Sequence, residues 1–227
     1  MKTIKLNNGI TIPMIGIGTN TFGKENKDYM GAINDDTKPL EYAFELGYRL
    51  IDTAIAYRNE SVVGLSLSKT TIDRKSFVVT TKLPGSPEYR NATQIDKAIN
   101  KSLKDLNVSY IDIMLIHHPW ENLEEILSVW NTLETYVKKG VIKTLGVSNF
   151  NEEQLGYLLT HANIKPALNQ IESHPGFFQQ ELIEFSQKHG VAIQAWGPLK
   201  KVSDEAKVVL ETIGKKYHKT WAQVALR

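Results

Sequence analysis

The sequence predicts a single domain over residues 1–227 with an α/β fold, the (β/α)8 barrel. Short β-branched segments alternate with longer amphipathic segments, which is typical of parallel strands joined by right-handed crossovers. No Gly-x-Gly-x-x-Gly opens a helix after the first strand, since Gly16-x-Gly18-Thr19 does not match that fingerprint. Polar residues also fall at the ends of several strands, and these ends converge in a barrel but spread along a crevice in an open sheet.

Seven strand-then-helix units can be followed along the chain. The expected strands are Met14–Ile17, Tyr48–Asp52, Ser76–Lys82, Tyr110–Ile116, Val141–Val147, Ala167–Ile171 and Val191–Trp196. The expected helices are Lys38–Leu46, Asn59–Leu67, Thr93–Leu106, Leu123–Lys138, Glu152–Leu159, Gln179–Lys188 and Glu205–Tyr217. Three of the helical segments are followed by a glycine just before the next strand, which predicts a left-handed C-cap at Gly47, Gly140 and Gly190.

Composition excludes several classes of protein. The net charge of +2 is close to balance and the lysines are scattered, so we expect no nucleic-acid partner and no anionic membrane surface. The chain has no cysteine, which excludes disulfides, a thiolate nucleophile and a cysteine-ligated zinc. The N-terminus lacks a continuous apolar segment, and the most apolar stretch, Ile111–Ile116, is too short to cross a bilayer. A cytoplasmic protein is the expectation.

Five polar residues stand at or just past the ends of five different strands: Asp52, Lys82, His117, Asn149 and Gln170. Tyr57 follows Asp52 by five residues, and its phenol has an ordinary pKa of about 10. An ammonium at Lys82 would lower that pKa, and a buried Asp52 would keep the ammonium charged. His117 could orient a substrate oxygen. Such a set can give a proton to a carbonyl oxygen, while the hydride must come from a cofactor.

Each of these residues has an ordinary structural interpretation on its own. Asp52 could be a turn residue, Lys82 an exposed loop lysine, and Tyr57 a packed aromatic. His117 and His118 could be polar residues where the chain leaves the sheet. Their joint placement after the second, third and fourth strands is what favours an active site.

Several motifs, in order, resemble the aldo-keto reductase family. The segment Ile51–Gly64, with the pattern I-D-T-A-x-x-Y-x-N-E-x-x-V-G, resembles the family signature. Leu115–Pro119 (LIHHP) resembles its fourth-strand motif, Gly140–Phe150 (GVIKTLGVSNF) its fifth and Asn169–Glu172 (NQIE) its sixth. The resemblance runs from about residue 3 to the last residue.

The resemblance implies a role for each matching position. Tyr57 would be the general acid, tuned by Lys82 and Asp52, with His117 and His118 facing a small carbonyl substrate. NADP(H) would be the cofactor. The residues that it would meet are Thr19, Asn20, Asp52, Ser148, Asn149, Gln170, Trp196, Pro198 and Leu199. Among these, Ser148, Asn149 and Gln170 would bind the nicotinamide carboxamide and Trp196 would stack on the ring.

Three positions depart from the family pattern. Trp196 stands where Tyr is common and Gly197 where Ser is common, so one hydrogen bond near the cofactor pyrophosphate should be missing. His118 stands where Trp is frequent, so the substrate pocket should be more polar. The segment Thr220–Arg227 resembles the one that precedes the eighth strand. We therefore expect about seven units, with the eighth strand, its helix and the loop for the adenosine 2′-phosphate missing, and a truncated product with poor activity.

Three functions follow as alternatives. The first is an NAD(P)H-dependent oxidoreductase that reduces aldehydes or ketones to alcohols, a monomer when complete. The second is a cofactor-binding regulatory subunit of the same fold. The third, a metal-dependent hydrolase, is disfavoured because His117 and His118 are adjacent in sequence and should point to opposite sides. We expect no metal site.

Overall fold

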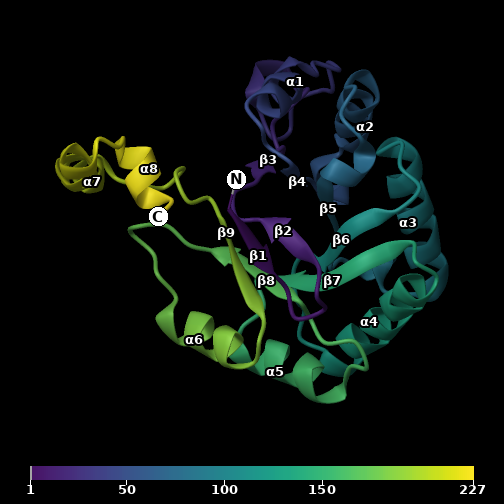
Figure 1. Cartoon of the computed structure of the whole chain (residues 1–227). Helices are drawn as coiled ribbons and strands as arrows, with labels where there is room; N and C mark the ends of the chain where they lie inside the picture. Colours follow the sequence, from purple (N-terminus) through teal and green to yellow (C-terminus); the bar gives the residue numbers. More distant parts are fainter. Residues whose placement is uncertain (1) are drawn as a thin grey trace.

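A computed structural model describes residues 2–227, and its main sheet contains seven parallel strands in sequence order (Figure 1). The strands are β3 (Ile17–Gly18), β4 (Leu50–Asp52), β5 (Val78–Leu83), β6 (Ile111–Ile116), β7 (Ile142–Ser148), β8 (Leu168–Glu172) and β9 (Ala192–Trp196). Every neighbouring pair in this sheet is parallel, which confirms the alternating strand and helix pattern.

The seven predicted helices are present, with ends that differ by at most two residues from the predicted ones. They are α1 (Lys38–Glu45), α2 (Glu60–Lys69), α3 (Ala92–Asp105), α4 (Leu123–Lys138), α5 (Glu152–His161), α6 (Gln180–Lys188), α7 (Asp204–Tyr217) and α8 (Trp221–Ala225). Short 3-10 turns cover residues 25–27, 55–57, 74–76 and 87–89. The three predicted glycine caps are confirmed, because Gly47, Gly140 and Gly190 have φ values of 90°, 73° and 71°.

Strand β6 lies in the middle of the sheet and is almost entirely buried, as a strand covered on both faces should be. Its one charged residue, Asp112, has specific partners there. The carboxylate accepts a hydrogen bond of 2.6 Å from the Arg74 guanidinium and one of 2.9 Å from the Val79 backbone N–H. These bonds replace the hydration that the carboxylate loses, so a charge is tolerated beside the core.

The sheet curls into an incomplete barrel with α1 to α6 around its outside (Figure 1). Strands β4 and β8 are separated by three others in the sheet, yet Gln170 Nε2 on β8 lies 2.7 Å from Asp52 Oδ2 on β4. In a flat sheet β4 and β8 would be about 19 Å apart, because they are four strand spacings apart and each spacing is about 4.8 Å. Within residues 2–227, β3 and β9 are the two edges of the sheet.

A small N-terminal hairpin was not predicted. Strands β1 (Thr3–Lys5) and β2 (Thr11–Pro13) pair antiparallel. Leu6 and Ile12 belong to one buried cluster with residues of β6 and with the beginning of β8, which are Ile113, Leu115, Ala167 and Leu168. The Asn7 amide donates to the Pro166 carbonyl at 2.9 Å. The hairpin therefore covers the amino-terminal end of the sheet, opposite the polar strand ends.

The first barrel strand was placed too early in the sequence. Only Ile17 and Gly18 pair with β4, while Met14 and Ile15 are exposed by 55% and 41%. The apolar pattern that suggested a strand over Met14–Ile17 belongs partly to the connection between the hairpin and the sheet. An apolar pattern over only four residues cannot distinguish a barrel strand from such a connecting segment.

Helices α7 and α8 pack on each other beyond β9, apart from the ring formed by α1 to α6 (Figure 1). Helix α8 was not predicted, although Thr220 and Gln223 form a capping box at its start. A bilayer span would need a longer apolar helix than any among the described residues.

The hairpin gives a test of stability. Replacing Ile12, which is 5% exposed, with Ala should lower the free energy of unfolding by about 2–4 kcal/mol, because the methyl groups removed leave a cavity against β6 and β8. Urea unfolding followed by circular dichroism measures this loss. The matched control is Ile4→Ala on the same hairpin, where the side chain is 40% exposed and a change within about 0.5 kcal/mol is expected. Equal losses for both variants would show that the hairpin does not cover the core.

Candidate active site

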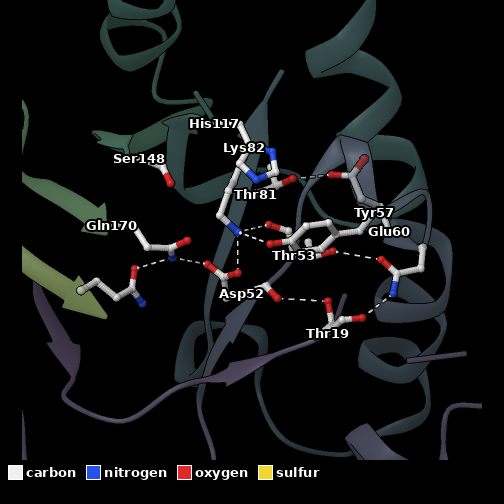
Figure 2. Close-up of polar contacts among 12 residues, drawn as sticks. Thr19, Asp52, Thr53, Tyr57, Glu60, Thr81, Lys82, His117, Ser148 and Gln170 are labelled. Atoms are coloured by element: carbon white, nitrogen blue, oxygen red, sulfur yellow. Dashed lines mark hydrogen bonds and ion pairs between the residues drawn. The ribbon is translucent and has the colours of Figure 1, made fainter. Parts of the chain in front are cut away.

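The carboxyl ends of β4 and β5 bring Asp52 and Lys82 into direct contact (Figure 2). Lys82 is fully buried, and its Nζ donates to Asp52 Oδ1 at 2.5 Å and to the Thr53 carbonyl at 2.8 Å. Burial lowers the pKa of the Lys82 ammonium, while the charge of Asp52 and its hydrogen bond act in the opposite direction. The buried ammonium is thus held by one carboxylate and one carbonyl.

Tyr57 completes this group from the 3-10 turn that follows β4. Its hydroxyl lies 3.3 Å from Lys82 Nζ, and the ammonium also lies 4.8 Å from the centre of the phenol ring. We expected Lys82 to lower the pKa of Tyr57. Instead, burial raises the pKa of Tyr57 well above its ordinary value, and Asp52 and Tyr29 raise it further. Tyr57 therefore keeps its proton at neutral pH.

Gln170 joins the opposite wall of the barrel to the same carboxylate. Its Nε2 donates to Asp52 Oδ2 at 2.7 Å and to Gln194 Oε1 at 2.9 Å, so both amide hydrogens are used (Figure 2). Gln194 was not singled out in the sequence. It is two residues before Trp196 on β9, so both side chains fall on the same face of that strand. This alternation of side chains along the strand could have predicted Gln194 as a site residue.

His117 and His118 do not point to opposite sides, which corrects our expectation. Their rings are stacked, with centroids 4.5 Å apart and planes at 13°. They follow the last residue of β6, where the chain leaves the extended strand geometry and the alternation of side chains ends. His117 also meets the Tyr57 ring edge to face, with centroids 5.7 Å apart.

Both imidazoles are held neutral. Burial, followed by the charge of Lys82 and the neighbouring His118, lowers the pKa of His117 to about 3. Burial and Lys82 also lower the pKa of His118. A neutral imidazole has one N–H donor and one acceptor nitrogen, so each ring can still donate one hydrogen bond.

A pocket of about 320 Å³ opens in front of these groups. Tyr57, His117 and His118 line it together with Tyr29, Pro84, Arg90, Pro119 and Trp120. Arg90 and Trp120 were not predicted as site residues. The guanidinium lies 4.5 Å from the centre of the Trp120 ring and donates to Glu125 at 3.0 Å, which fixes both side chains in the wall.

Asn149 lies at the end of β7 with a left-handed backbone, φ 63°, which asparagine adopts more readily than most residues. Its Oδ1 accepts a hydrogen bond of 2.8 Å from Trp196 Nε1. Its Nδ2 lies 3.1 Å from each of three acceptors: the His117 carbonyl, Ser148 Oγ and His118 Nδ1. The amide of Asn149 is therefore already engaged within the chain.

The remaining predicted cofactor residues are more widely spread. Thr19 is buried in the loop after β3, and its hydroxyl donates to the Asp52 carbonyl at 3.0 Å. The carbonyl of Asn20 accepts from Lys24 Nζ at 2.9 Å. Pro198 and Leu199 lie in a turn directly after β9, where the Lys200 N–H donates to the Gly197 carbonyl at 3.2 Å. These two are near Trp196 in sequence, but no hydrogen bond joins them to the Tyr57 group.

Two further residues of the signature segment are buried supports. The Asn59 amide donates to the carbonyls of Thr19 and Phe22 at 2.6 and 2.9 Å, which ties the loop after β3 to the start of α2. Glu60 accepts from the Thr81 hydroxyl at 2.6 Å, next to Lys82 on β5. Both positions are fixed in the signature pattern of Ile51–Gly64, which was the sequence signal for these supports.

Comparisons with known proteins identify the family of this chain. The family model described as "Aldo/keto reductase family" matches residues 14–227. The chain belongs to the aldo/keto reductase family.

Among curated relatives, glyoxal reductase of Bacillus subtilis is 36% identical to this chain over 225 residues. The matched residues cover 99% of this chain and 77% of that protein. This chain is 34% identical to methylglyoxal reductase DkgA of Escherichia coli over 228 residues, or 99% and 78% of the two chains. Among solved structures, an aldo/keto reductase from Brucella melitensis has a TM-score of 0.88 at 35% identity, covering 99% of this chain and 82% of that one. A Bombyx mori aldo-keto reductase in complex with NADP has a TM-score of 0.86 at 31% identity, covering 99% and 78%.

The strand ends of this aldo/keto reductase fit a nicotinamide carboxamide, which needs one donor and one acceptor from the protein. Ser148 and Gln170 are register partners on β7 and β8, so their side chains are neighbours at the carboxyl end of the sheet. The Ser148 hydroxyl lies 3.1 Å from Asn149 Nδ2 and still has its own hydrogen to donate. Gln170 Oε1 has no hydrogen-bond partner between Lys2 and Arg227 and can accept.

The neutral state of His117 predicts how stability changes with pH. The unfolded chain binds a proton at His117 below about pH 6.5, whereas the folded chain binds it only near pH 3, so unfolding takes up a proton between these values. Stability should therefore fall as the pH drops through this range, by at most about 1.4 kcal/mol per pH unit from this group. Urea unfolding at pH 5 and pH 7 should show a smaller difference for His117→Asn than for the unaltered chain. The control is His218→Asn, at an exposed position whose left-handed backbone asparagine accepts. An unchanged pH difference in His117→Asn would contradict the account.

Proposed function

We propose that this aldo/keto reductase uses NADP(H) to reduce small aldehydes and ketones to alcohols, with Tyr57 as the general acid. The observation that carries the proposal is the buried ammonium of Lys82, 3.3 Å from the Tyr57 hydroxyl and 2.5 Å from Asp52 Oδ1. The group lies on the wall of a pocket of suitable size for a small carbonyl compound.

Tyr57 and Lys82 act on the oxygen of the substrate. A nicotinamide cofactor, when bound, would supply the hydride for the carbonyl carbon, and negative charge would then develop on the carbonyl oxygen. Tyr57 transfers its proton to that oxygen, so the product is a neutral alcohol. The phenolate that remains is stabilised by the Lys82 ammonium, whose charge Asp52 supports. A raised pKa in the resting site suits this role, because the donor must still hold its proton when the substrate arrives.

His117 orients the carbonyl before the transfer. Its ring is neutral and lies beside Tyr57, so a ring N–H can share the carbonyl oxygen with the phenol without adding a competing acid. This arrangement would hold the oxygen at a fixed position relative to the Tyr57 proton.

Ser148 and Gln170 would hold the nicotinamide carboxamide, and Trp196 would support the ring by stacking. Thr19, Asn20, Pro198 and Leu199 would border the rest of the cofactor. The choice of NADP(H) is supported by the Bombyx mori relative that was crystallised with NADP. The names of the glyoxal and methylglyoxal reductases support a small carbonyl substrate.

A cofactor-binding protein without catalysis is the second candidate, because the same residues could bind a nicotinamide cofactor for regulation. The pocket beside Tyr57 favours the enzyme, since a protein that only senses the cofactor has no need for a cavity of about 320 Å³ next to a proton donor.

Removal of one hydroxyl separates the two candidates. Tyr57→Phe should lower kcat for an aldehyde by about 10²–10⁴-fold, because the proton donor is lost, while the Kd for NADPH changes less than about twofold. Turnover is measured from NADPH absorbance and binding from NADPH fluorescence. Tyr42→Phe, at an exposed position on α1, is the control and should match the unaltered chain. Turnover in Tyr57→Phe within a few-fold of normal would reject Tyr57 as the acid.

The carboxamide assignment is tested by binding alone. Ser148→Ala should raise the Kd for NADPH by about tenfold, because one buried hydrogen bond to the cofactor is lost. Fluorescence titration of the full chain measures the Kd. Ser128→Ala, on the exposed face of α4, is the control. An unchanged Kd in Ser148→Ala would remove Ser148 from the cofactor site.

A further inference from the structure

A chain of hydrogen bonds crosses from the proposed cofactor side of the site to the substrate pocket. It starts at Trp196 on β9, passes through the amide of Asn149 at the end of β7, and ends at His118 after β6. The first bond decides the orientation of the amide. The indole N–H of Trp196 can only donate, so the atom 2.8 Å from it must be the oxygen of Asn149.

The other end of the amide is then its NH₂ group, which agrees with the other contacts. Asn149 Nδ2 lies 3.1 Å from the His117 carbonyl, which can only accept. The same nitrogen lies 3.1 Å from His118 Nδ1. The NH₂ group cannot accept a hydrogen bond, so a hydrogen on His118 Nδ1 would have no acceptor at this contact, and the unprotonated Nδ1 is the form that fits. The ring is neutral, because burial and Lys82 lower the pKa of His118, so its single hydrogen must be on Nε2.

His118 lines the same pocket as Tyr57 and His117. Its Nε2 has no hydrogen-bond partner in the part of the chain that the structure describes, and the same is true of both ring nitrogens of His117. Because the two rings are stacked at 4.5 Å and nearly parallel, their N–H edges can meet two different oxygens of one small molecule. Two oxygens on neighbouring carbon atoms are closer together than the two ring centres, so the two N–H groups would converge on them.

We propose that His118 is a specificity-determining residue whose Nε2–H, set by the Trp196–Asn149 relay, selects carbonyl compounds that bear a second oxygen on the adjacent carbon. His117 and Tyr57 hold the oxygen of the reacting carbonyl, and His118 holds its neighbour. The substrate class rests on the function proposed above. The protonation state of His118 does not, so the two can fail separately.

The protonation state is tested by NMR on the uniformly ¹⁵N-labelled full chain at pH 7. Long-range ¹H–¹⁵N correlations should show His118 with hydrogen on Nε2, and the spectrum of His118→Phe identifies its signals by their loss. Asn149→Asp keeps an acceptor for Trp196 but places a carboxylate oxygen at Nδ1, so the hydrogen should move to Nδ1 or the ring should gain a second one. Hydrogen on Nδ1 in the unaltered chain would overturn the proposal.

Selectivity is tested by binding, without turnover. Methylglyoxal and propanal have three carbons each, and only methylglyoxal has the second oxygen. In the chain loaded with NADP⁺, methylglyoxal should shift the His118 signals, whereas propanal at the same concentration should not. Equal shifts with both compounds, or none with either, would overturn the selectivity.

Kinetics with NADPH complete the test. In His118→Phe, which keeps an aromatic ring but removes the donor, kcat/KM should fall about tenfold for methylglyoxal and less than about twofold for propanal. His118→Gln restores an N–H and should recover part of the methylglyoxal rate. An equal loss for both substrates, or no loss, would reject the role of His118. If the unaltered chain reduces neither compound, the proposed reductase function fails, and the NMR results alone decide the inference about His118.

Discussion

The site depends on one buried ion pair. An ammonium with no exposure to water is costly unless its hydrogens are satisfied, and Lys82 satisfies them with Asp52, the Thr53 carbonyl and the Tyr57 hydroxyl. Removing any one partner would leave a charge or a polar hydrogen unpaired in the core. The pair therefore holds the ends of β4 and β5 and the turn that bears Tyr57 in one arrangement. The contacts that stabilise the buried ammonium are therefore the same ones that position the proposed proton donor.

The same carboxylate also links the two walls of the incomplete barrel. Asp52 receives Lys82 on one oxygen and Gln170 on the other, so it spans from β5 to β8 across the interior. Gln194 on β9 extends this link by one more strand. The hairpin of β1 and β2 covers the opposite end of the sheet, which leaves the carboxyl end as the open, polar one. The hydrogen bonds of Asp52 thus both join the walls of the curved sheet and form part of the candidate active site.

The fold was predictable because the signals for it are local. Alternating strands and helices, the glycine caps and the polar strand ends all depend on residues close in sequence, and the observed sheet confirms them. The hairpin and α8 were missed because each is short and owes its place to contacts elsewhere: Leu6 and Ile12 with β6 and β8, and α8 with α7. The start of the first barrel strand was misplaced for the same reason.

By itself, the sequence determined which residue types stand at the strand ends, and these were enough to predict Tyr57, Lys82, Asp52 and His117 as one group. Only the tertiary structure decided how those groups behave. The pKa of Tyr57 moves up rather than down, because burial of the phenol and the nearby charge of Asp52 both raise it. The stacking of His117 on His118, and the relay through Asn149, depend on where three strands end in space. Solvation and through-space contact are properties of the packed chain, and no spacing along the sequence specifies them.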